Sequence, residues 1–471
     1  MITRRSFLST FAAAGLAPAA DRKPNILILL GDDMGYHDIS LHGSKEMRTP
    51  NIDSIAKNGI RCTNGYVSCP YCSPTRSGLM TSRYQTRYGH EFNEGPGPMT
   101  FGLPLTETTI AQRLKELGYA TYAGGKWHLG AGLEYRPMKR GFDEFYGTVA
   151  NTPFYHPPQF VDSRVGPEAK RVEDPEFYTT RAYATRVTEI IEANKARPFF
   201  VYMAWNAVHA PSEAPQPTLD RFKGAPTDLR QYQAAITAEL DDGIGKILAK
   251  LRELKLDSNT LVFFLSDNGG PQPGLRTDNT PLKGYKASTW EGGIRVPFLV
   301  QWKGRLPAGK TYSHPVIQLD IQPTALAAAG GSTKQDWKLD GVNLLPHLEG
   351  KNSARPHETL FWRFGPQWAI RKGDWKLMQA SEEKLLPQIA LPKMPVGPVH
   401  LYDLSRDIRE SNDLSAKHPE KVKELQRRQP NHEDLSEFMR SVVAPARDHC
   451  HALLRTWLAE SRCRGLPASG L

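Results

Sequence analysis

The stretch Asn25-Ile26-Leu27-Ile28-Leu29-Leu30, followed at once by Gly31-Asp32-Asp33, decides the fold class of this chain. A short apolar run without polar alternation is typical of a strand buried on both faces of a parallel sheet. Three further apolar runs also lead directly into polar residues. They are Thr260–Leu265 before Asp267 and Asn268, Phe199–Trp205 before His209, and the weaker Tyr119–Ala123 before Lys126 and His128.

Helical patterns lie between these runs, at Thr108–Leu117 and at Leu229–Leu254, where apolar residues recur with the helical period. Alternating strands and helices predict an α/β fold with a large, mostly parallel sheet flanked by helices. Ligands of such sheets bind outside the carboxyl ends of the strands. We therefore expect two acidic pairs, a lysine and two histidines to meet at one edge of the sheet.

The sequence changes in character after about Asp340. The segments His357–Met378 and His400–Leu404 contain short aromatic-rich strands separated by turns. They predict a small C-terminal subdomain of antiparallel strands with a helix, over residues 341–425, after a main domain over residues 21–340. The tail, residues 426–471, contains Cys450 and Cys463, and the sequence assigns no role to it.

The N-terminus has the form of an export signal. Arg4-Arg5 precedes a short apolar stretch, and Ala17-Pro18-Ala19 supplies small residues for cleavage. Residues 1–20 therefore predict a twin-arginine signal peptide of a bacterial protein that is periplasmic or secreted. The signal implies that the twin-arginine machinery exports the folded chain, so any modification is installed in the cytoplasm.

Composition excludes some function classes. The 471 residues carry 60 Lys+Arg against 50 Asp+Glu, a net charge of +10. This balance is compatible with a polyanionic partner, but no basic run is interleaved with aromatic residues, so we expect no nucleic-acid partner. No apolar run after the N-terminus is long enough to span a membrane.

The stretch Cys72-Ser73-Pro74-Thr75-Arg76 carries the most specific chemistry. Five cysteines are an odd number, which leaves at least one unpaired or modified in an exported protein. Cys69 and Cys72 also have the spacing of a redox pair, which is the alternative interpretation of Cys72. The residues from Pro74 to Met80 predict the start of a helix, whose positive end favours an anion near Cys72.

Several motifs in this order resemble the type I sulfatases, formylglycine-dependent enzymes of the alkaline phosphatase-like superfamily. They are Asp32-Asp33, Cys72–Arg76 continued by Ser77–Tyr84, and Gly125-Lys126-Trp127-His128. The resemblance runs from about Lys23 to about Leu414. It implies the sulfatase fold and a Cys72 that is oxidised to formylglycine. The hydrated aldehyde has two hydroxyls: one attacks sulfur, and the other, once deprotonated, expels sulfate.

The resemblance also assigns roles to site residues. Carboxylate and amide oxygens suit Ca²⁺ or Mg²⁺, and the family implies one Ca²⁺ held by Asp32, Asp33, Asp267, Asn268 and the modified Cys72. Arg76 is expected to hold the nucleophile end of the site, and Lys126 and Lys286 to contact sulfate oxygens. Lys283 competes with Lys286, whose spacing to Glu291-Gly292-Gly293 matches the family better.

Two histidines are the acid–base candidates. The family implies that His128 contacts the formylglycine hydroxyl and assists sulfate release, while His209 protonates the leaving oxygen; their roles could be partly exchanged. His90 and His156 lie in loop-like stretches, where substrate-binding and structural roles are equally open.

The sequence therefore predicts a sulfuric ester hydrolase acting on a sulfated carbohydrate or an aryl sulfate. It implies a cytoplasmic formylglycine-generating enzyme as a partner. The alternatives are a phosphomonoesterase or phosphodiesterase of the same superfamily, and a non-catalytic binder of sulfated glycans whose Cys72 stays a thiol. The sugar, the sulfate position, endo or exo action and the oligomeric state stay open.

Overall fold

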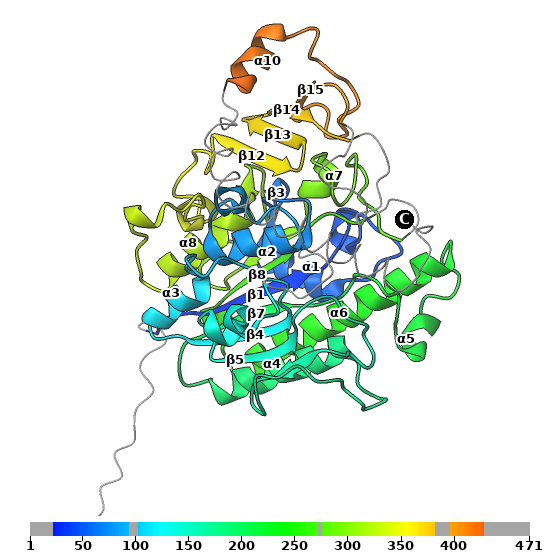
Figure 1. The fold of residues 1–471 in the computed structure, drawn as a ribbon, viewed down its shortest axis with the longest axis vertical. Helices are drawn as coiled ribbons and strands as arrows, with labels where there is room; N and C mark the ends of the chain where they lie inside the picture. The colour runs from blue at the N-terminus through cyan, green and yellow to red at the C-terminus, as the bar shows by residue number, and fades with distance from the viewer. Residues whose placement is uncertain (1–21, 94–101, 272–275, 382–395, 428–471) are drawn as a thin grey trace, which may run out of the picture.

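A computed structural model describes residues 22–93, 102–271, 276–381 and 396–427 of the chain (Figure 1). The predicted export signal, Cys450 and Cys463 lie outside the described residues. A nine-stranded sheet dominates the described part of the chain. Its order is β10 (Lys310–Tyr312), β2 (Ile60–Cys62), β9 (Phe298–Gln301), β8 (Thr260–Ser266), β1 (Asn25–Gly31), β7 (Phe199–Ala204), β4 (Ala120–Lys126), β5 (Glu144–Thr148) and β6 (Phe160–Asp162).

The centre of this sheet is parallel and its flanks are mixed. β8, β1, β7, β4 and β5 pair in parallel, as do β10 and β2. The pairs β8–β9, β9–β2 and β5–β6 are antiparallel. The four predicted strands are confirmed and form the centre of the sheet, which accounts for their continuous apolar runs.

Helices cover both faces of the sheet, as predicted (Figure 1). Alternate residues of β1 point to opposite faces: Ile26, Ile28 and Leu30 enter one hydrophobic core, and Leu27 and Leu29 enter the other. The first core is completed by α2 (Cys72–Thr81), α3 (Ile110–Glu116), α8 (Ile321–Ala328) and α9 (Leu345–Leu348). The second is completed by α1 (Pro50–Lys57), α4 (Thr179–Ala193) and α6 (Asp228–Glu253).

Shorter elements connect these layers. The further helices are α5 (Gln216–Asp220) and α7 (Glu291–Ile294), and β3 (Gly65–Tyr66) pairs with β11 (Val316–Ile317). The 3-10 turns are η1 (Ser40–His42), η2 (Gln85–Tyr88), η3 (Leu133–Tyr135), η4 (Pro137–Lys139), η5 (Asp257–Asn259), η6 (Gln318–Asp320) and η7 (Gln335–Trp337).

A four-stranded antiparallel sheet forms the predicted C-terminal part, at the top of Figure 1. It consists of β12 (Thr359–Phe364), β13 (Gln367–Lys372), β14 (Trp375–Gln379) and β15 (His400–Asp403), followed by α10 (Pro419–Gln426). Its inner face shares a hydrophobic core with residues of the main body, among them Tyr66, Trp290 and Leu319. The two parts are therefore packed together without a solvent layer.

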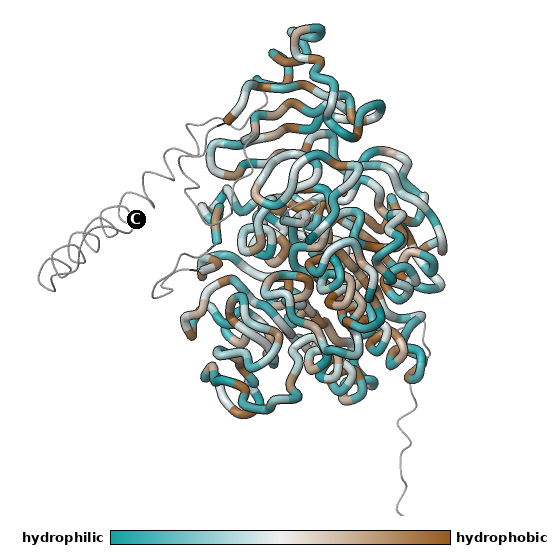
Figure 2. Tube along the Cα trace, turned by 90° about the vertical axis from the view of Figure 1, so that its right-hand side faces the viewer, coloured by the Kyte–Doolittle hydropathy of each residue, from teal (hydrophilic) through white to brown (hydrophobic). Residues whose placement is uncertain are grey.

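Hydrophobic segments run through the middle of the larger body, and the outer loops are mostly hydrophilic (Figure 2). Among the described residues, no helix combines the length and the apolar character needed to cross a membrane.

Candidate active site

Polar residues from two strand ends and one helix start meet at the carboxyl edge of the sheet. Asp32 and Asp33 follow β1, Asp267 follows β8, and Cys72 is the first residue of α2. One ligand atom of each of these four residues lies within 4.8 Å of the others, and all four residues are buried. The strand ends thus bring together side chains that are up to 235 positions apart in the chain, as the topology of a parallel sheet requires.

Cys72 sits beside the carboxylates in a protected position. Its Sγ lies 3.6 Å from Asp32 Oδ1 and 3.9 Å from Asp33 Oδ1. Burial raises the pKa of the Cys72 thiol well above its usual range, so the thiol is neutral near pH 7. Cys69 and Cys72 are both free thiols. An unmodified Cys72 would therefore be a poor nucleophile. The helix that was expected to start at Pro74 begins two residues earlier, at Cys72 itself.

Arg76 is fully buried and ties three elements of the site together. Its Nε and one terminal nitrogen donate to Asp267 Oδ2 at 2.9 and 2.7 Å, and the other terminal nitrogen donates to the Lys126 carbonyl oxygen at 2.7 Å. The same guanidinium lies 3.5 Å from Asp32 Oδ2. Arg76 thus fixes α2 against the ends of β8 and β4.

Two lysines complete the charge balance of the cluster. Lys126 Nζ donates to Asp32 Oδ2 and Lys286 Nζ donates to Asp33 Oδ1, each at 2.6 Å. Lys283, the competing residue, instead lies over the Trp290 ring with Nζ 3.6 Å from its centroid. The site therefore holds three acidic and three basic side chains, counting Arg76.

The carboxylates differ in their proton affinity. Burial raises the pKa of Asp32, but nearby positive charges, first that of Lys126, more than offset burial and hold the pKa below its ordinary value. Asp33 behaves similarly, with Lys286 as the main positive charge. Burial, together with the charge of Asp32, raises the pKa of Asp267 to about 6. Asp32 and Asp33 therefore stay ionised to lower pH than Asp267.

Asn268 provides an unpaired oxygen at this cluster. Its Nδ2 donates to Asp33 Oδ1 at 2.7 Å, whereas its Oδ1 is buried without a hydrogen-bond partner among the described residues. A buried polar atom without a partner costs free energy, about 1–3 kcal/mol. Carboxylate oxygens with an unpaired amide oxygen form the donor set that Ca²⁺ and Mg²⁺ prefer, so the residues fit a hard divalent cation.

His128 and His209 differ in their access to solvent. His128 is buried, has φ 57° and leaves Nδ1 without a partner among the described residues, and burial lowers its pKa well below the usual range. His209 is 20% exposed, with Nε2 3.5 Å from Asp33 Oδ2 and 3.3 Å from Asn151 Nδ2. His209 Nδ1 lies 2.7 Å from the Ala210 carbonyl oxygen, an acceptor, so Nδ1 carries the proton in the neutral ring.

Comparison with known proteins decides the family. The family model described as Sulfatase matches residues 24–332. The chain belongs to the sulfatase family. N-acetylgalactosamine-6-sulfatase of Canis lupus familiaris is 34% identical over 395 residues, which cover 78% of this chain and 74% of that protein. Arylsulfatase J of Mus musculus is 31% identical over 473 residues, covering 90% and 77%.

Solved structures agree with this assignment. The crystal structure of Ps i-CgsB superposes with a TM-score of 0.78 at 32% identity, covering 86% of this chain and 92% of the other. The predicted fold of the alkaline phosphatase-like superfamily is thereby confirmed, and the chain is a formylglycine-type sulfatase, a sulfuric ester hydrolase. The family generally uses formylglycine and Ca²⁺.

Sequence reasoning on this sulfatase missed several residues of the site. Ser73 Oγ donates to the His128 carbonyl oxygen at 2.6 Å and lies 2.6 Å from His90 Nε2, while Asn93 Oδ1 accepts the Ser73 backbone N–H at 2.9 Å. His90 is thus a buried residue beside α2, whereas His156 is exposed. Asn151 follows β5, so recognising that strand would have revealed it.

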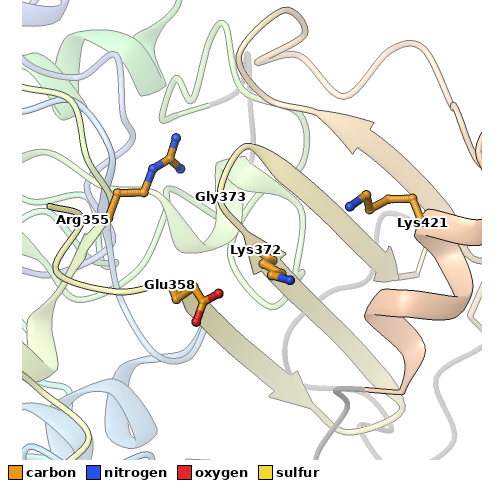
Figure 3. A pocket seen from close by; sticks show the side chains of 5 residues that line it. All are labelled: Arg355, Glu358, Lys372, Gly373 and Lys421. Carbon is orange, nitrogen blue, oxygen red and sulfur yellow. The ribbon is translucent and has the colours of Figure 1, made fainter.

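A separate hollow opens on the small C-terminal sheet of this sulfatase (Figure 3). Its cations are paired with acids: Arg355 lies 3.2 Å from Asp374, and Lys372 and Lys421 lie 2.6 and 2.5 Å from Glu424. It shares no residue with the cluster at the carboxyl edge. The hollow is lined by Arg355, Glu358, Lys372, Gly373 and Lys421.

Proposed function

We propose that this sulfatase releases sulfate from sulfated carbohydrates with a formylglycine made from Cys72 and a bound Ca²⁺. The observation that carries the proposal is the buried cluster in which a neutral thiol adjoins three carboxylates within 4.8 Å. A neutral thiol is a weak nucleophile, and its sulfated form has no easy exit. A hydrated formylglycine at the same position offers a hydroxyl for attack on sulfur and a second hydroxyl that allows sulfate to leave.

The cation site is assigned to Asp32, Asp33, Asp267 and Asn268, together with residue 72. The buried Asn268 Oδ1, which lacks a partner among the described residues, supports this assignment. A bound Ca²⁺ would supply positive charge that stabilises the ionised nucleophile and the sulfate oxygens.

The cations of the chain would bind the sulfate group. Lys126 and Lys286 each hold one carboxylate of the cluster at 2.6 Å, so their ammonium groups already point into it. We assign them to sulfate oxygens, where they offset charge that develops in the transition state. Arg76 would hold the nucleophile end indirectly, because it fixes Asp267 and the Lys126 backbone at the start of α2.

The two histidines would act in proton transfer. His128 has an unpaired Nδ1 inside the site and would take the proton of the formylglycine hydroxyl when sulfate leaves. His209 lies on the more open side, and its Nε2 faces Asp33 and Asn151. In its doubly protonated form, His209 would donate from Nε2 to the oxygen of the leaving sugar. Burial lowers the pKa of His209 to about 4, so this form is the minor one near neutral pH in the free protein.

The substrate class follows from the relatives. One relative is named for N-acetylgalactosamine-6-sulfate chemistry, and Ps i-CgsB is also known in complex with k-i-k-neocarrahexaose. These names support a sulfated carbohydrate as the substrate of this chain. The twin-arginine pattern at Arg4-Arg5 supports export to the periplasm or beyond, after a formylglycine-generating enzyme has modified the chain in the cytoplasm.

Fragmentation mass spectrometry of the tryptic peptide Cys62–Arg76 tests the machinery. The peptide from protein made in its native host is expected to carry an aldehyde in place of the Cys72 thiol, and Cys69 in the same peptide is the unmodified internal control. The same protein loaded with Ca²⁺ should release sulfate from at least one member of a sulfated-glycan panel. If Cys72 is still a thiol, or if the modified protein binds glycans without releasing sulfate, the result would support a non-catalytic binder of sulfated glycans.

Relative rates on nitrophenyl sulfate and nitrophenyl phosphate test the alternative that the chain is a phosphoesterase. A sulfatase is expected to favour the sulfate ester. A clear preference for the phosphate ester would assign the chain to the phosphoesterases of the same superfamily.

A further inference from the structure

We infer that Gln367, in the small C-terminal sheet, is a positioning residue that sets the location of the Lys286 ammonium group. The inference rests on the proposed function, because Lys286 is the group that acts on sulfate. It assigns the C-terminal sheet a part in the reaction although the sheet contributes none of the cation-binding residues.

The backbone next to Lys286 is held in an unfavourable conformation. Ala287 has φ 66°, in the left-handed region that disfavours any residue with a Cβ. Two hydrogen bonds hold it there: Ala287 N–H donates to the Pro70 carbonyl oxygen and Gln367 Nε2 donates to the Ala287 carbonyl oxygen, each at 2.8 Å. Pro70 lies two residues before Cys72, so the first bond ties the Lys286 segment to the nucleophile segment.

The Gln367 amide is itself fixed in orientation. The residue is fully buried, and its Oε1 accepts the Ser381 backbone N–H at 3.0 Å. With oxygen assigned to Ser381, the nitrogen must face the Ala287 carbonyl. Ala287 is 6% exposed, so its carbonyl oxygen would have little access to water if the Gln367 donor were lost.

The other end of the segment is held from the same side. Glu291 begins α7, and its backbone N–H donates to Glu410 Oε2 at 2.8 Å. Lys376 Nζ lies 2.9 Å from Glu291 Oε1. The stretch between Lys286 and Glu291 is therefore clamped at both ends by the C-terminal part of the chain, and Gln367 is the clamp nearer to Lys286.

Loss of this clamp should affect turnover more than substrate binding. The Lys286 ammonium is placed at 2.6 Å from Asp33 Oδ1, where it can meet charge that develops on sulfate. A misplacement of about 1 Å in a catalytic group costs up to about 100-fold in rate. Gln367→Glu keeps the size of the side chain but replaces the donor by a carboxylate oxygen facing the Ala287 carbonyl.

The test compares Gln367→Glu with Gln379→Glu in the full-length modified enzyme loaded with Ca²⁺. Gln379, on β14, is partly buried and makes a similar pair of bonds away from Lys286: its Nε2 donates to the Gly397 carbonyl oxygen, and its Oε1 accepts from the Trp368 indole N–H. We expect Gln367→Glu to lower kcat by about 10- to 100-fold at pH 8 with a smaller change in KM. The ratio to wild type should recover at lower pH, where the introduced carboxyl group is protonated and donates again. Gln379→Glu should keep the wild-type kcat.

A double variant shows whether the effect acts through Lys286. In a Lys286→Met background, Gln367→Glu should lower kcat by less than about threefold, because coupled residues are not additive. Wild-type kcat in Gln367→Glu, or an undiminished effect in the Lys286→Met background, would overturn the inference while leaving the sulfatase function in place.

Hydrogen exchange of the Pro281–Trp290 peptide gives a readout that does not depend on turnover. The amides of this peptide should exchange faster in Gln367→Glu than in wild type or Gln379→Glu, because the hydrogen bond from residue 367 to the Ala287 carbonyl oxygen is lost. If wild-type protein released no sulfate but this difference appeared, the proposed function would fail and the clamp would stand. Equal exchange in all three proteins would refute the clamp itself.

Discussion

Replacing Lys376 by methionine should destabilise the junction between the two sheets by several kcal/mol. The Lys376 ammonium lies 2.9 Å from Glu291 Oε1 and 2.8 Å from Glu410 Oε1, and all three side chains are fully buried. Methionine has nearly the length and volume of lysine, so packing changes little. The substitution therefore removes charge and leaves two carboxylates facing each other in the interior.

The expected loss is about 3–5 kcal/mol in the free energy of unfolding, the usual cost of removing one partner from a buried ion pair. Two features of the cluster limit the loss. Arg295 lies 3.3 Å from Glu291 Oε2 and continues to neutralise that carboxylate. Burial raises the pKa of Glu410 to about 7 even in the wild type, so in the variant Glu410 can take up a proton instead of staying charged.

Urea unfolding followed by tryptophan fluorescence at pH 7.5 measures this loss. Lys372→Met is the matched control on the neighbouring strand, because Lys372 pairs with Glu424 at 2.6 Å where both side chains are partly exposed. Exposed pairs contribute about 0–1 kcal/mol, so the control should lose less than about 1 kcal/mol. If Lys376→Met lost no more than Lys372→Met, the cluster would not be a tightly coupled buried ion pair, and the reasoning would be refuted.

Further predictions concern pH, the cation and the leaving group. Because the folded-state pKa of Glu410 is raised from 4.5 to about 7, wild type should lose about 3 kcal/mol relative to Glu410→Gln as pH rises through that window; a difference in urea midpoints that stays constant between pH 5 and pH 8 would contradict this. Asn268→Ala should weaken Ca²⁺ binding about tenfold or more in calorimetry, whereas an unchanged Kd would remove Asn268 from the ligand set. His209→Ala should slow hydrolysis of a sugar sulfate far more than that of nitrophenyl sulfate, whose leaving group needs no proton; an equal loss on both would argue against His209 as the acid.

The sequence allowed the centre of the fold to be predicted because both faces of the sheet are covered. Ile28 faces one core and Leu29 the other, so the strand has no polar alternation and stands out as an apolar run. The flanks gave no such signal. β2 and β10 are three-residue strands, and β9 runs antiparallel between β2 and β8, which depends on long-range pairing.

The candidate site was predictable where a residue directly follows a central strand. Asp32, Asp267 and Lys126 come at the ends of β1, β8 and β4, so the topology places them together. Lys286 lies in a loop, and its assignment depended on the family resemblance. Asn93 reaches the Ser73 backbone N–H from a loop 20 positions away, a contact that no local pattern encodes.

The contact between the C-terminal sheet and the Lys286 segment shows why a change in sequence character is not a functional boundary. Aromatic strands after about residue 340 mark a change in secondary structure, and their inward-facing polar residues, Gln367 and Lys376, must find partners because burying them unpaired is costly. Those partners lie across the junction, at Ala287 and Glu291, and the Glu291–Glu410 bond spans 119 positions. A polar residue at a buried strand position therefore reveals that a partner exists, while the fold alone reveals which one. Here the partners belong to the loop that carries Lys286, so the small sheet cannot be removed without releasing a residue of the proposed reaction.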